Sequence, residues 1–140
     1  MPISQSLPPD VIFSTLYSVL ALTDSILQIW LTLTFAVIVS TYVAVKRFDR
    51  SVYLLITFLY SFASAIQLMR FVSAAHQAFY YKNLLDARGF GPWPVPNVVS
   101  VLIGGGSIAL IIAGTLSTLW FVRATWKNVT ALRQGPSPEA

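Results

Sequence analysis

The sequence predicts an all-α integral membrane protein with three transmembrane helices, a long antiparallel helical hairpin followed by a third helix. Apolar residues make up 56% of the 140 residues and charged residues only 10%, whereas a soluble domain carries about 25% charged residues. The mean hydropathy is +0.70. Three uncharged apolar stretches, at 26–45, 52–69 and 98–122, have lengths close to the roughly 20 residues that cross a bilayer core.

Each stretch is expected to be helical, because a helix satisfies its own backbone hydrogen bonds where no water is available. The alternating pattern of barrel strands is missing. We therefore expect one transmembrane domain over residues 1–140. It contains helices at about 10–46, 51–87 and 98–133, a loop at 88–97 and a flexible tail at 134–140.

The first helix is expected to start at Pro8, Pro9 and Asp10, where turn-forming residues precede an acid near the positive end of the helix dipole. A helix over 10–46 would be roughly 55 Å long, well beyond the roughly 30 Å hydrocarbon core. Part of it should project, tilt or bend, with a bend expected at 23–25. The alternatives are a separate interfacial helix over 10–22 and a short re-entrant segment.

The limits of the other two helices are predicted from the segments that interrupt the helical pattern. The polar segment 46–51 is too short for anything but an antiparallel hairpin turn. The segment 89–97 contains three prolines and two glycines, which stop a helix completely. The glycine and prolines of 135–138 end the third helix.

The distribution of basic residues predicts the orientation. One side of the membrane would hold six of them and the other side two, which places the C-terminus in the cytoplasm and the N-terminus outside. A plasma or inner membrane is the expected location. The six are Lys46, Arg47, Arg50, Arg123, Lys127 and Arg133, and the two are Lys82 and Arg88.

The most informative residue is Arg70, because a charge near the bilayer centre costs about 2.5–3.5 kcal/mol. In a hairpin centred near residue 48, Arg70 lies level with Gln28 and one turn from Asp24, so an ion pair with Asp24 is expected. Such an arrangement is a functional polar site, a clamp that fixes helix register, or an Arg70 that snorkels outward. The predicted intramembrane polar cluster contains Asp24, Gln28, Gln67, Arg70 and Gln77.

The cluster residues of the second helix belong to a longer stripe at 3-4 spacing, which places them on one helix face. A helix–helix interface is favoured over the lining of an aqueous path, because amide side chains bond across such interfaces. The stripe contains Tyr60, Ala63, Gln67, Arg70, Ala74, Gln77 and Tyr81.

The third helix carries small residues at every fourth position, a pattern that lets helix backbones approach closely. The partner is a helix of this chain or of another one. The run of three glycines near the start of this helix predicts a kink or an unwound point, since each glycine costs about 1 kcal/mol relative to alanine. The predicted packing residues are Gly104, Gly105, Gly106, Ala109, Ala113 and Ser117.

Little in the sequence points to catalysis. Cysteine is absent and His76 is the only histidine, so no metal ligand set is available, and we expect neither a metal nor a cofactor. His76 is expected at the outer interface, with pH sensing as an alternative. Trp93, within the stiff proline-rich segment 92–96, is expected to anchor in the headgroup layer or to serve in an external recognition loop.

The sequence therefore predicts a non-enzymatic membrane protein that acts through helix–helix assembly, as a homo-oligomer or as an accessory subunit of a larger complex. One alternative is an oligomeric channel lined by the polar face of the second helix. Another is an intramembrane lipid-binding or lipid-modifying protein. The expected partners are the lipid bilayer and other transmembrane helices. Nucleic acid is not expected, because the basic residues form no stripe.

Overall fold

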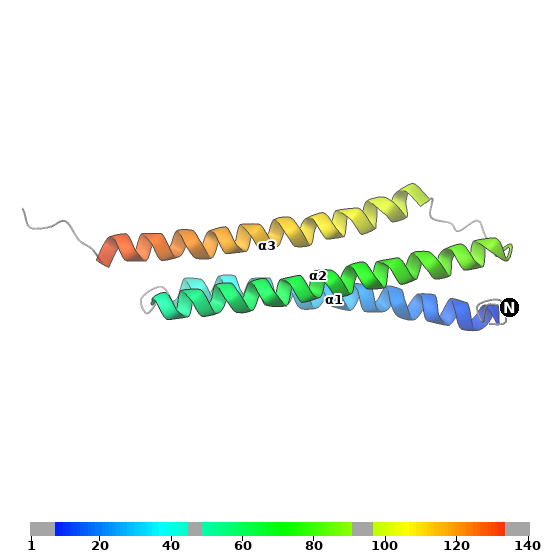
Figure 1. Ribbon diagram of the computed structural model, residues 1–140, viewed down its shortest axis with the longest axis horizontal. Coiled ribbons are helices and arrows are strands. Elements are labelled where there is room, and N and C mark those ends of the chain that lie inside the picture. The colour runs from blue at the N-terminus through cyan, green and yellow to red at the C-terminus, as the bar shows by residue number, and fades with distance from the viewer. Residues whose placement is uncertain (1–7, 45–48, 91–96, 134–140) are drawn as a thin grey trace, which may run out of the picture. The chain divides into compact units, whose positions relative to one another are not determined.

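The computed structural model describes residues 8–44, 49–90 and 97–133, which form three helices in chain order. These are α1 (Pro9–Val43), α2 (Arg50–Ala87) and α3 (Asn97–Arg133) (Figure 1). No strand occurs within the described ranges. The predicted all-α class with three long helices is confirmed.

The helix bounds differ little from those expected. α1 ends at Val43, three residues before the predicted end at 46. It is also one helix throughout, without the separate interfacial helix over 10–22 and without an interruption at 23–25. Two hydroxyl groups in this segment are satisfied by their own helix, since Thr23 Oγ1 donates to the carbonyl of Val19 at 2.9 Å and Ser25 Oγ donates to that of Ala21 at 3.0 Å.

Both described ends of α2 carry a cap. At its start, the Arg50 N–H donates to Asp49 Oδ1 at 2.7 Å. At its end, Gly89 has a φ of 80°, a left-handed conformation that glycine adopts without a steric penalty. The Gly89 N–H then donates to the carbonyl of Asp86 at 3.1 Å and the Phe90 N–H to that of Leu85 at 3.2 Å. These two hydrogen bonds together form a Schellman motif. The motif ends α2 close to the predicted position.

All three helices are long and apolar enough to cross a membrane. Their surfaces agree with this, because many large apolar side chains are exposed, where a soluble protein would bury them. Examples are Phe35, Phe58, Met69, Leu102 and Trp120, each more than 60% exposed. The helices therefore indicate a membrane protein whose exposed apolar surface contacts lipid.

The contacts within the chain divide it into two units, and each helix contributes to both. Unit 1 comprises residues 1–28 and 67–109, and unit 2 comprises residues 29–66 and 110–140. In unit 1, Ile12 and Leu16 of α1 form a buried cluster with Leu85 of α2. Phe13 and Phe90, the residue after the Schellman glycine, extend this cluster with an edge-to-face contact at 5.9 Å between ring centroids.

Unit 2 is built around buried aromatic side chains. Trp30 of α1 is only 2% exposed and fills the space beside Gly114 of α3, where an added Cβ would lie 2.5 Å from Trp30 Cη2. The Trp30 indole Nε1 donates to Thr115 Oγ1 at 3.3 Å. Tyr60 of α2 is 1% exposed, and its hydroxyl forms a 2.9 Å hydrogen bond with Thr34 Oγ1. Large apolar rings are thus buried with their polar ends satisfied.

Candidate functional site

All five residues of the predicted polar cluster belong to unit 1. Asp24, Gln28, Arg70 and Gln77 are exposed, and Gln67 is half-buried. The structure describes both Asp24 and Arg70, and it contains no ion pair between them. The five residues therefore share a unit, while their action as one functional cluster stays a prediction.

Gln67 is the cluster member that points furthest inward. Its Oε1 is buried without a hydrogen-bond partner, and the buried hydroxyls of Thr41, Thr57 and Ser64 in unit 2 are also unpartnered. An unsatisfied buried polar group costs about 1–3 kcal/mol, and one buried water at each position would remove this cost. Gln67 is therefore the member of the predicted cluster that carries this cost.

The predicted stripe on α2 separates into two rows. Tyr60 and Ala74 are buried, and Gln67 and Tyr81 are half-buried, whereas Arg70 and Gln77 are exposed. The inward row repeats every seven residues, which is nearly two full turns and keeps its members on one line. Within the described helices, this row packs against the chain's other helices, and the side chains of Arg70 and Gln77 remain on the outside.

The small residues of α3 face outward. Gly105 and Ala109 in unit 1 and Ala113 and Ser117 in unit 2 are each exposed. A Cβ added at Gly104, Gly105 or Gly106 would meet nothing within 4 Å. α3 is also helical through 104–106, so the expected unwinding at the glycines is wrong. In a bilayer no water competes for the backbone groups, and the helical hydrogen bonds persist despite the low propensity of glycine.

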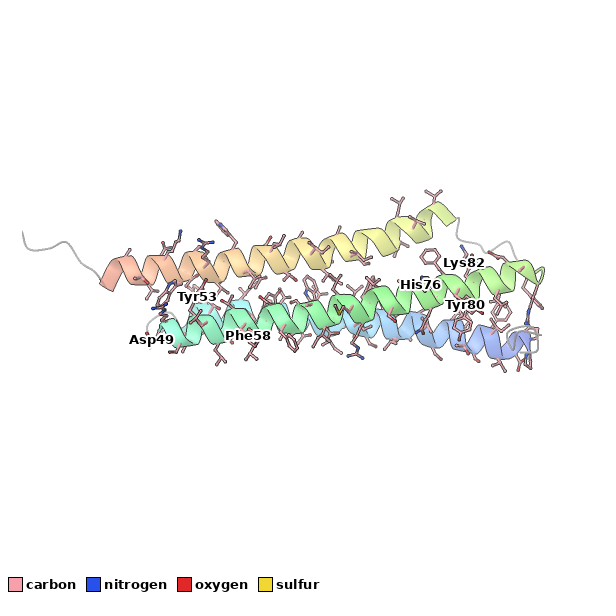
Figure 2. The ribbon with its side chains drawn as sticks, viewed as in Figure 1. Asp49, Tyr53, Phe58, His76, Tyr80 and Lys82 are labelled. Atoms are coloured by element: carbon pink, nitrogen blue, oxygen red, sulfur yellow. The ribbon has the colours of Figure 1, made fainter. Side chains whose placement is uncertain are left out.

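Of the remaining predicted residues, one lies within the described structure and the others lie outside it. His76 is exposed on α2 (Figure 2), where it borders a shallow depression with Ser73 and Gln77. Trp93 lies outside the described residues, and so does the tail at 134–140. A role for His76 in pH sensing stays a prediction.

Asp24 lines a groove within unit 1. The groove is bounded by the first part of α1, the second half of α2 and the start of α3, and has a volume of about 620 Å³. Most of its lining is apolar, with Asp24 of α1 and Lys82 of α2 as its charged residues. Figure 2 shows Lys82 in the second half of α2. The groove has the size of a small-molecule site, which is about 300–1,000 Å³.

Two features were not predicted from the sequence. One is the contact of Trp30 with Gly114, because nothing in the spacing of these residues along the chain shows that they meet. The other is the aromatic lining of the groove, which comes from Tyr17, Phe71 and Phe79. These three residues come from two helices, and their spacing in the sequence carries no sign that they meet.

Among the residues that the structure describes, no group of three or more His, Asp or Glu side chains is placed to hold a metal ion. The candidate features of this membrane protein are therefore the outward small-residue stripe of α3 and the groove of unit 1. No protein-family model, no curated protein and no solved structure matches the chain.

Proposed function

We propose that this protein is a non-enzymatic membrane protein that assembles with a second copy of itself through the small-residue stripe of α3, defined as Gly105, Ala109, Ala113 and Ser117. The observation that carries the proposal is the outward exposure of all four residues. A stripe of small residues lets helix backbones approach closely. Because this stripe faces away from the other helices of the chain, it does not contribute to packing within the chain.

A second copy is the partner that best fits this stripe. Close approach needs small residues on both helices, and two identical α3 helices supply them from the same positions in a symmetric pair. In lipid, association is driven by van der Waals packing and interhelical hydrogen bonds. The Ser117 hydroxyl adds a polar group to the otherwise apolar contact.

The test is the mass of the purified protein in a mild detergent, measured by native mass spectrometry over a range of protein concentrations. We expect a dimer or a higher homo-oligomer. Ala113→Leu should raise the dissociation constant at least tenfold, because added bulk separates the two backbones. The matched control is Ala65→Leu, the same substitution at an exposed position of α2 in the same unit, which should leave the mass unchanged.

Three outcomes would contradict the proposal. An unchanged oligomer in Ala113→Leu would mean that the stripe faces lipid. A different chain that co-purifies in fixed ratio, and is lost in Ala113→Leu, would make this protein an accessory subunit. Ion conductance in reconstituted liposomes that disappears in Gln77→Leu, with the oligomer intact, would favour a channel lined by α2.

A further inference from the structure

The groove of unit 1 extends along the helices for roughly half the thickness of a membrane. Its lining on α1 runs from Leu16 to Leu27, a rise of about 16 Å at 1.5 Å per residue. Half of the hydrocarbon core measures about 15 Å. An apolar molecule that enters this groove from one leaflet would therefore find cover along most of its length.

Asp24 is the uncompensated charge of this groove. Its side chain is exposed and lines the groove, and no hydrogen bond or ion pair is found for its carboxylate among the described residues. An aspartate in the middle of a spanning helix costs about 2.5–3.5 kcal/mol. A bound cation would offset much of that cost.

Lys82, the basic residue of the lining, does not neutralise Asp24. It lies one turn from Leu85, which packs against Leu16 near the other end of the groove. The two charges are thus separated by about 7–8 Å along the helix axes. Lys82 also makes an interaction of its own. The groove therefore contains a lysine that already has an interaction and an aspartate, Asp24, that has no partner among the described residues.

Aromatic side chains in the groove also favour a cation. Tyr17 and Phe79 line the groove together with Asp24, and an aromatic ring attracts a cation that approaches its face by about 0.5–2 kcal/mol. Charge complementarity therefore favours a positive ligand. The apolar remainder of the lining favours one with a hydrophobic body.

We propose that the unit 1 groove binds a hydrophobic organic monocation taken from the bilayer. The positive charge lies at the Asp24 carboxylate, and the apolar body packs against Leu20 and Phe79. The site is complete within one chain, because all its lining residues belong to unit 1. It therefore does not depend on the assembly proposed above.

The experiment compares two ions of the same shape and opposite charge, tetraphenylphosphonium and tetraphenylborate, by equilibrium dialysis against the full chain in mild detergent. We expect saturable binding of one phosphonium per chain and at least tenfold weaker binding of the borate. Asp24→Asn should weaken phosphonium binding at least tenfold. The matched control is Asp86→Asn, an exposed aspartate of the same unit outside the groove, which should change it less than twofold.

A second variant keeps the test decisive if Asp24→Asn does not fold. Ala75→Phe fills the groove while Asp24 is retained, and it should also weaken phosphonium binding at least tenfold. Its control is Ala87→Phe, which lies outside the groove and should leave phosphonium binding unchanged. Equal binding of both ions would show an apolar groove without charge selection and overturn the proposal. Preferential binding of the borate, lost in Lys82→Gln, would overturn it in favour of an anionic amphiphile.

Discussion

Glycines of α3 have opposite surroundings in the two units. In unit 2, Gly114 leaves a space that Trp30 fills so closely that a Cβ would lie 2.5 Å from the ring. In unit 1, Gly104 borders the groove, and a Cβ there would meet nothing within 4 Å. The same residue type on the same helix thus supports a tight contact in one unit and open space in the other.

The difference lies in what faces each glycine. Unit 2 contains two large rings, Trp30 and Tyr60, that are almost fully buried and hydrogen-bonded to threonines of neighbouring helices. The groove of unit 1 is bordered by Ala75 and Ala78 of α2, which are too short to fill it. A small residue therefore creates a packing site only when a large side chain faces it. The space beside Gly114 in unit 2 is therefore filled, and the space beside Gly104 in unit 1 is open.

The largest expected effect comes from Trp30→Ala. Removal of a fully buried tryptophan leaves a cavity and should lower the free energy of unfolding by about 3–5 kcal/mol. The measurement is SDS-induced unfolding in mixed micelles, followed by circular dichroism. Trp120→Ala is the control, because Trp120 is 72% exposed and its loss leaves no cavity. Equal losses in both variants would remove the distinction between a packed ring and a lipid-facing ring.

Gly114→Ala should be the next most damaging change. Its Cβ would overlap the indole of Trp30, and such overpacking costs about 1–3 kcal/mol, less the roughly 1 kcal/mol that alanine gains in helix propensity. We expect a net loss of up to about 2 kcal/mol in the same unfolding assay. A gain in stability would mean that Trp30 relaxes without cost, and that unit 2 is less tightly packed than the structure indicates.

Tyr60→Phe tests the polar part of the unit 2 core. It removes the 2.9 Å hydrogen bond to Thr34 while the ring remains, so the expected loss is about 0.5–1.5 kcal/mol. Tyr42→Phe serves as control, since Tyr42 is 76% exposed. If the two variants unfold at the same SDS fraction, the buried hydrogen bond adds nothing to stability.

Gly106→Ala should have the smallest effect and the opposite sign. Because nothing lies within 4 Å of the added Cβ, only helix propensity changes, and we expect a gain of about 0.5–1 kcal/mol. Set against Gly114→Ala, it measures directly how the two units differ. A loss of stability in Gly106→Ala, measured at a concentration where the protein is monomeric, would show that unit 1 is packed at this position.

Much of the architecture was predictable from composition and local pattern. Stretches long enough to span a bilayer must be helical, since no other backbone arrangement satisfies their polar groups in lipid. The ends were predictable where a specific residue stops or starts a helix, as at Pro9 and Gly89. At Val43, where the described part of α1 ends, no such residue stands, and the predicted end at 46 lies outside the described residues.

The sequence by itself determined that this chain is helical, apolar and divided into three long segments, because these properties depend on residues that are neighbours along the chain. Only the tertiary structure decided which small residues are covered and which charges stand alone. Gly114 is covered by Trp30, while the small-residue stripe of α3 faces outward. Asp24 lines a groove, and its carboxylate has no hydrogen-bond or ion-pair partner among the described residues. These outcomes depend on how each helix is rotated about its own axis. In a weakly amphipathic helix the sequence does not determine this rotation, and it is fixed only when side chains from different helices pack together.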